Sequence, residues 1–193
     1  MITPEQVKEL REKTGISVMQ CRKALEESGG DFEKALLLLK RKGADVAAKK
    51  SDRDLGAGTV ASYVHSSGTI GAMVTLMSET DFVSKNKEFM DLARDIAMHV
   101  AAANPEFLTK EEVDADSLAK IKEVLVKELE GRPENLKEQI LQGKIDSYFS
   151  DKILLEQAFI KNDTQKIKDL ISDATQKFGE KIAIGKFARF SAN

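Results

Sequence analysis

The stretch IGAMVTLMSETDFVSKNKEFMDLARDIAMHV, residues 70–100, decides the fold that we predict for this chain. Its first part, Ile70 to Met77, is an apolar run typical of a strand. Its last part has the i, i+3, i+4, i+7 spacing of a buried helix face. The residues at those positions are Phe89, Leu92, Ala93, Ile96 and Val100. Between strand and helix lies the tetrapeptide Thr80–Val83, so a carboxylate and an aromatic ring share one turn.

Two interpretations of this turn follow from the residues. In the first, Thr80 or Asp81 caps the helix and Phe82 packs under it as a hydrophobic staple. In the second, the turn presents Asp81, Phe82 and Val83 to a partner, because loops held by a rigid scaffold often carry binding residues. The residues of the turn alone favour packing.

Outward from this stretch, the patterns predict an α+β body over residues 58–193. Strands are expected over residues 59–65, 69–78 and 182–190, the first two forming a hairpin. Helices are expected over residues 86–103, 116–130, 133–149 and 164–178. The segment of about 115–149 is then a helical hairpin, interrupted by the stop-start signal Gly131 and Pro133. The predicted body is an antiparallel three-stranded sheet packed with helices.

Residues 1–45 predict a separate three-helix bundle, similar to the ubiquitin-associated type of binding module. Capping signals at Thr3, Ser17 and Asp31 begin the three helices, and glycines, the last of them Gly43, end them. The residues expected to face inward are Val7, Leu10, Val18, Cys21, Ala24, Leu25, Phe32, Ala35, Leu36 and Leu39. Residues 46–57 are expected to be a linker to the body.

Composition excludes several classes of function. The 193 residues include one cysteine and two histidines, so we expect no disulfide and no metal site. The sequence has no G-x-x-x-x-G-K-[ST] phosphate-binding loop, so we expect no bound nucleotide and no cofactor. It also has no motif around a nucleophile, so we expect that the protein is not an enzyme. Neither a membrane-spanning run nor a basic-then-apolar leader is present, which predicts a cytoplasmic protein.

Several separate motifs follow one another along the chain in an order that is typical of one family. They are Val7–Gly15, Met19–Leu25, Gly43–Ala44, Ala47–Lys50, Glu79–Val83, Ile96–Ala102, Asn104–Phe107, Leu154–Gln157 and Phe187–Phe190. This order resembles the bacterial elongation factor Ts family over nearly the whole chain. The length resembles the short form of that family, which has one core module where longer members have two.

The resemblance implies a guanine nucleotide exchange factor for elongation factor Tu. It assigns Thr80, Asp81, Phe82 and Val83 to a loop that displaces Mg²⁺ and loosens GDP in the partner. Phe82 is then a wedge between helices beside the nucleotide, and this reverses the preference for packing at the turn.

The resemblance also implies a partner-facing turn in the bundle, at Val18, Met19 and Gln20. Gln20 stands where the family usually has an acidic residue, which removes a charge from this contact. His99 has two open interpretations, a half-buried packing residue or a partner contact. A homodimer is expected to replace the missing second module, through a third-strand edge or a helix face.

Two other classes compete with this interpretation. A protein-binding adaptor is supported only by residues 1–45 and leaves the Thr80–Val83 turn without a role. A nucleic-acid binder is favoured by Lys40–Lys42 and Lys49–Lys50, but no aromatic stacking platform accompanies these lysines. We therefore expect no direct nucleic-acid partner.

Overall fold

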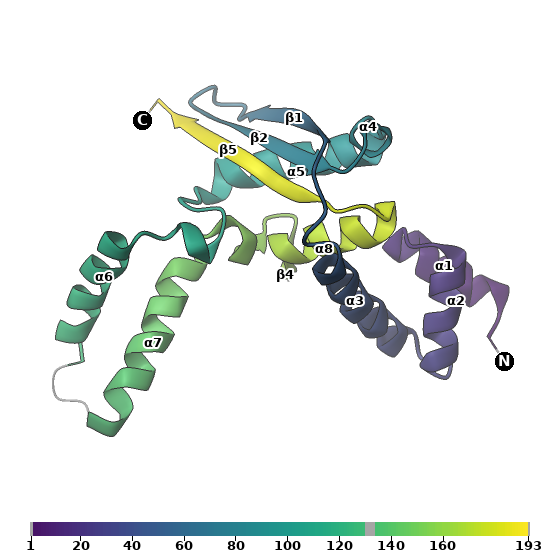
Figure 1. The fold of residues 1–193 in the computed structure, drawn as a ribbon, viewed down its shortest axis with the longest axis horizontal. Helices are drawn as coiled ribbons and strands as arrows, with labels where there is room; N and C mark the ends of the chain where they lie inside the picture. The colour runs from purple at the N-terminus through teal and green to yellow at the C-terminus, as the bar shows by residue number, and fades with distance from the viewer. Residues whose placement is uncertain (1, 130–133, 193) are drawn as a thin grey trace. The chain divides into compact units, whose positions relative to one another are not determined.

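Three helices open the chain in the computed structural model, which describes residues 2–129 and 134–192 (Figure 1). They are α1 (Pro4–Thr14), α2 (Val18–Glu27) and α3 (Phe32–Lys49). Thr3 caps α1 in a complete capping box, and Gly15 ends it with φ 68°, a left-handed conformation that suits glycine. The core of this bundle is made by Val7, Leu10, Ile16, Cys21, Ala24, Leu25, Ala35 and Leu39. The predicted three-helix bundle is confirmed.

The prediction that Gly43 ends the third helix is wrong, because α3 continues to Lys49. Gly43 lies inside α3, where a Cβ atom would come within 2.9 Å of the side-chain oxygen of Gln176. Gln176 belongs to helix α8 (Ile167–Phe178). The glycine therefore permits a close approach between α3 and α8, a role that the sequence pattern does not distinguish from a helix stop.

The central sheet has the strand order β1-β2-β5, with β1 at Ala57–Val64, β2 at Ile70–Ser78 and β5 at Ala183–Ser191. β1 and β2 form a hairpin closed by the hydrogen bond from His65 N to Ile70 O, 2.8 Å. The end of β5 lies beside the start of β2, where Ala192 N donates to Thr69 O over 2.8 Å, so this pair is also antiparallel. The predicted antiparallel three-stranded sheet is confirmed.

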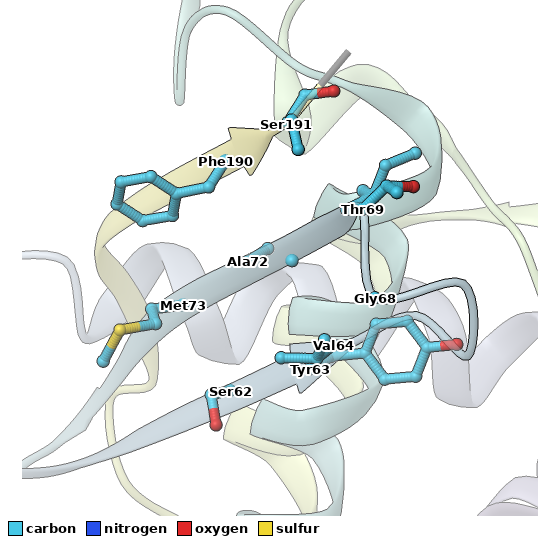
Figure 2. A pocket seen from close by; sticks show the side chains of 12 residues that line it. Ser62, Tyr63, Val64, Gly68, Thr69, Ala72, Met73, Phe190 and Ser191 are labelled. Carbon is cyan, nitrogen blue, oxygen red and sulfur yellow. The ribbon is translucent and has the colours of Figure 1, made fainter.

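One face of the sheet is covered and the other is open. Along β2 the side chains of Ala72, Val74 and Leu76 are buried, whereas Met73 between them is exposed. A hollow of about 430 Å³ lies over strands β1, β2 and β5, and Figure 2 shows Met73 and Phe190 on its neighbouring strands β2 and β5. Large apolar side chains on the open face of a sheet are not part of the core and remain exposed to solvent.

Helix α5 (Lys87–Ala103) follows the one-turn helix α4 (Asp81–Ser84), and its predicted apolar face is buried except for Leu92, which is half-buried. Arg189 of β5 donates to the carbonyl of Ala101 in α5 over 2.9 Å, so the end of this helix lies against the sheet. Near the other end of α5, the rings of Phe89 and Phe178 meet edge to face with centroids 5.9 Å apart.

Helices α6 (Ala115–Lys127) and α7 (Glu134–Ser150) form the predicted helical hairpin (Figure 1). Gly131 and Pro133, the predicted stop-start signal between them, lie outside the described residues. A separate core at the base of the hairpin contains Ile145, Phe149 and Ile153. Short 3-10 helices flank the hairpin at Lys110–Glu112 and Leu154–Glu156.

The prediction of a helix over residues 164–178 is wrong at its start. Residues Asn162–Lys166 form strand β4, which pairs antiparallel with β3 (Ala158–Phe159), and α8 begins only at Ile167. The β4 sequence NDTQK has no alternating apolar residues, so its sequence carries no strand signal.

The described chain forms two compact units, each built from three stretches. The first contains Met1–Ala61, Thr75–Ala93 and Lys168–Gly185, and the second contains Ser62–Val74, Arg94–Ile167 and Lys186–Asn193. The bundle therefore belongs to a unit that also includes parts of the body. The division into domains at residues 1–45, 46–57 and 58–193 stays a prediction.

Candidate functional site

Phe82 is the most distinctive residue of the first unit, because 87% of its surface is exposed. It lies on α4, a helix of one turn that begins three residues after the buried Ser78. The next two residues, Val83 and Ser84, turn inward and are buried. The staple interpretation is therefore not what the structure has, since Phe82 points to solvent and Val83 takes the buried position.

Asp81 lies beside Phe82 on the same turn and is also exposed. Its carboxylate accepts a hydrogen bond from Lys85 Nζ at 2.7 Å, an i, i+4 ion pair. This hydrogen bond and the charge of Lys85 hold the pKa of Asp81 below its ordinary value. Asp81 therefore stays ionised at neutral pH, and its carboxylate remains accessible next to an exposed aromatic ring.

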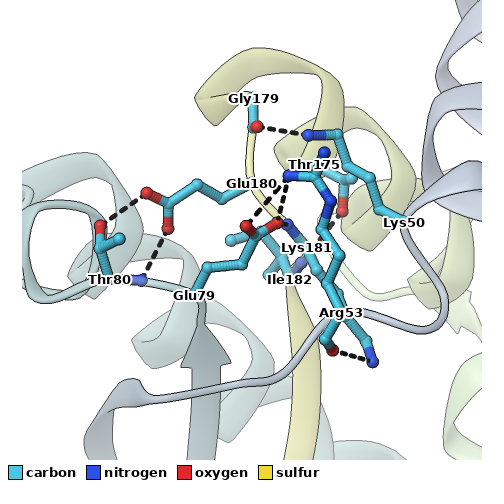
Figure 3. A network of polar contacts seen from close by, with 9 residues as sticks. All are labelled: Lys50, Arg53, Glu79, Thr80, Thr175, Gly179, Glu180, Lys181 and Ile182. Carbon is cyan, nitrogen blue, oxygen red and sulfur yellow. Dashed lines mark hydrogen bonds and ion pairs between the residues drawn. The ribbon is translucent and has the colours of Figure 1, made fainter.

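Thr80 precedes the helix but does not cap it with its side chain. Its hydroxyl instead donates to Glu180 Oε1 at 2.6 Å, and its backbone N–H donates to Glu180 Oε2 at 3.0 Å (Figure 3). On the next residue back, Glu79 accepts from the backbone N–H of Lys181 at 2.5 Å and from Arg53 at 3.0 and 3.2 Å. We call Glu79, Thr80, Glu180 and Lys181 the carboxylate clasp.

The clasp holds the Glu79 carboxylate in its ionised form. The hydrogen bond from the Lys181 backbone, followed by those from Arg53, lowers the pKa of Glu79 from its ordinary value. Neither Glu180 nor Lys181 belongs to a motif that the sequence singles out. Glu180 is 100 residues from Thr80, so no local spacing connects them.

The start of α2 carries the predicted second contact of the same unit. Ser17 caps this helix by accepting from Gln20 N at 3.4 Å. Met19 and Val18 leave 81% and 50% of their surfaces exposed. The prediction that Val18 faces inward is therefore wrong, because Ile16, just before the cap, fills that part of the core. Gln20 is also exposed, so all three residues are accessible to a partner.

His99 lies in the second unit and is fully buried. Its Nε2 lies 2.9 Å from Gln157 Oε1, and its Nδ1 accepts from Ile160 N at 3.3 Å. Burial lowers the pKa of His99 from its ordinary value. This placement agrees with the packing interpretation; a direct partner contact by His99 would first require the β3–β4 segment to move away.

No group of three His, Cys, Asp or Glu residues arranged to hold a metal ion occurs within residues 2–129 and 134–192. Among the helices of those residues, none has both the length and the apolar character needed to cross a bilayer. The features of the first unit that stand out are two exposed side chains, Phe82 on α4 and Met19 on α2.

Comparison with known proteins gives a consistent result. A family model described as Elongation factor TS matches residues 46–193. A protein of Thermodesulfovibrio yellowstonii named Elongation factor Ts is 46% identical over 98% of this chain and 95% of its own length. Its namesake in Fervidobacterium nodosum is 45% identical over 97% of this chain and 96% of its own length. The one in Carboxydothermus hydrogenoformans is 46% identical, with 98% and 88% covered.

Proposed function

Because this chain belongs to the elongation factor Ts family, we propose that it is the guanine nucleotide exchange factor of elongation factor Tu. Family membership establishes a role in translation elongation, and the similar lengths of two relatives fit a short form of the family. The observation that carries the proposal is Phe82, an aromatic side chain exposed over 87% of its surface beside the ionised Asp81.

The proposed mechanism needs no bond-making by this chain. A GTPase holds GDP through a phosphate loop and a Mg²⁺ ion that neutralises phosphate charge. Phe82 enters between helices of the partner beside that site, and Asp81 accepts hydrogen bonds from partner donors. When the Mg²⁺ ligands are displaced, the phosphate charge is exposed and GDP leaves faster. The factor acts in the cytoplasm, binds no nucleotide itself and is not an enzyme.

The turn at the start of α2 supplies the proposed docking contact. Val18 and Met19 are apolar and exposed, and an apolar side chain that becomes buried in a complex makes a strong anchor. Gln20 lies beside them and adds hydrogen-bonding capacity without charge. Once the bundle has docked, the Thr80–Val83 turn of the same molecule is held near the partner. This second contact therefore forms at a high effective concentration.

The experiment that tests this function replaces Phe82 and measures release of a fluorescent GDP analogue from elongation factor Tu. We expect Phe82→Ala to slow release at least tenfold while the melting temperature stays near that of the unchanged protein, because an exposed side chain contributes little to the core. If Phe82 instead belonged to the core, the same change would cost about 3–5 kcal/mol of stability.

A matched control is Leu37→Ala, which truncates another exposed apolar side chain, on α3. This variant is expected to keep both the stability and the exchange rate of the unchanged protein. A folded Phe82→Ala protein that releases GDP at the normal rate would falsify the exchange mechanism.

We also propose that two copies associate through the open face of the sheet. Val64, Met73 and Phe190 are exposed apolar side chains of β1, β2 and β5 around the hollow of Figure 2. A second copy placed on this face would bury these three side chains in both copies, so the apolar area of two equivalent faces is removed from water. This interface is the open face of the sheet, whereas the sequence led us to expect the edge of the third strand or a helix face.

A further inference from the structure

The carboxylate clasp joins two segments by a reciprocal pair of bonds (Figure 3). The carboxylate of Glu79 accepts from the backbone N–H of Lys181 at 2.5 Å. The carboxylate of Glu180 accepts from the backbone N–H of Thr80 at 3.0 Å. Each of two consecutive residues on one segment is thus bonded to one of two consecutive residues on the other. Bonds between a charged acceptor and a backbone N–H are stronger than neutral ones.

The clasp fixes the backbone directly before Phe82. Thr80 donates through both its N–H and its hydroxyl to Glu180, and its carbonyl accepts from Ser78 Oγ at 2.9 Å. All three polar groups of Thr80 are therefore engaged. Phe82 lies only two residues further on, so a rotation of the Thr80 backbone would swing its ring away.

The hydroxyl bond of Thr80 is made instead of a helix cap. A threonine in this position usually accepts from an N–H of the first helical turn, and that bond stabilises the helix. Thr80 forms no such cap bond, although it occupies the N-cap position of α4. The local stability of α4 thus does not account for the orientation of the Thr80 side chain, whereas the bond to Glu180 does.

The orientation of an exposed aromatic ring depends more on the backbone that carries it than the orientation of a buried ring does. Neighbouring side chains hold a buried ring in place, but Phe82 has most of its surface in water. A side chain that is already oriented before docking loses less conformational entropy when it binds. In the clasp Thr80 is exposed and Glu79 and Glu180 are half-buried, so solvent still reaches the charges and keeps their contribution to overall stability small.

We propose that Glu180 is a positioning residue for nucleotide exchange, which acts by holding Thr80 so that Phe82 projects in the orientation that enters the partner. This inference rests on the exchange function proposed above and assigns a residue that is distant in sequence to the same site. Glu180 itself does not touch the nucleotide in this scheme.

The test combines Glu180→Ala and Phe82→Ala in a double-mutant cycle, read out as GDP release from a saturated complex with elongation factor Tu. We expect Glu180→Ala to slow release about tenfold, the effect of losing a hydrogen bond to a charged group. In the Phe82→Ala background the same change is expected to have no further effect, because no ring remains to be positioned. Glu180→Gln keeps one acceptor oxygen and is expected to recover part of the rate.

Two further measurements exclude a purely structural role. The melting temperature of Glu180→Ala is expected to match that of Glu138→Ala, which removes a carboxylate from α7. Hydrogen exchange of the Thr80 amide is expected to accelerate in Glu180→Ala and to stay slow in the control, since only the first variant loses the acceptor of that N–H.

The outcomes separate this inference from the proposed function. Normal GDP release by Phe82→Ala overturns both the exchange function and the positioning role, because Phe82 would then not contribute to release and its orientation would not matter. Slow release by Phe82→Ala together with normal release by Glu180→Ala overturns only the positioning role. An equal loss from Glu180→Ala with and without Phe82 also overturns it, because Glu180 would then act by another route.

Discussion

Phe82 and Met19 are the most exposed large apolar side chains in the part of the chain that the structure describes. Single exposed apolar residues are common on protein surfaces and carry little information. These two differ because each is the second residue of a helix, Met19 of α2 and Phe82 of α4, so regular backbone carries each exposed side chain. For Val18 the sequence supports two conflicting predictions, since its spacing to Cys21 and Leu25 favours the buried face of α2 whereas the family resemblance favours an accessible turn, and the structure has it exposed.

The contribution of Met19 can be measured by Met19→Ser. We expect the affinity for elongation factor Tu to fall about tenfold, the effect typical of removing an interface anchor, with no change in melting temperature. Met90→Ser is the matched control, because Met90 is another exposed methionine of the first unit, on α5. Titration calorimetry against elongation factor Tu provides the measurement. Equal affinities of the two variants would remove Met19 from the docking contact.

At the scale of elements, the sequence predicted those whose side chains are periodic. The strands β1, β2 and β5 and the helices α5, α6 and α7 were predicted close to their observed bounds, because apolar residues mark their buried faces. The β3–β4 hairpin was not predicted, since its polar strand is defined by backbone pairing alone. The same distinction holds for the site. Thr80–Val83 is a local motif that the sequence reveals, whereas Glu180 is distant in sequence and comes next to this motif only in the folded chain.

The β3–β4 element also determines the state of His99. The N–H of Ile160, just after β3, donates to the unprotonated Nδ1, so a proton added to Nδ1 would face a donor. The pKa of His99 is lower in the folded chain than in the unfolded chain, where it is about 6.5. Between these two values the unfolded chain binds more protons. Stability is therefore complete above pH 6.5 and decreases as the pH falls toward the folded pKa.

This pH dependence is the prediction for His99. Urea unfolding between pH 7.5 and 5.5 is expected to show a loss of stability in the unchanged protein and a flatter profile in His99→Asn. His65, the other of the two histidines, is exposed, and His65→Gln is expected to retain the profile of the unchanged protein. A flat profile for the unchanged protein would contradict the assignment of a neutral, buried His99.

At the scale of the whole molecule, the short chain has one sheet whose outer face carries apolar side chains. A dimer through that face predicts that light scattering gives twice the chain mass of 21.3 kDa at micromolar concentration. Phe190→Lys places a charge on the face and is expected to give the single-chain mass. Val18→Ser, which removes an exposed apolar group from α2, is expected to leave the dimer intact. A single-chain mass for the unchanged protein would exclude this interface.

The buried position of Cys21 has a consequence for measuring how the bundle opens. Cys21 is the only cysteine of the chain, its side chain is inaccessible in the bundle core, and burial raises the pKa of its thiol. A thiol reagent therefore reacts only in molecules whose bundle has come apart. The rate of covalent labelling gives the free energy of those openings that expose Cys21, whereas an opening confined to the helical hairpin contributes no signal.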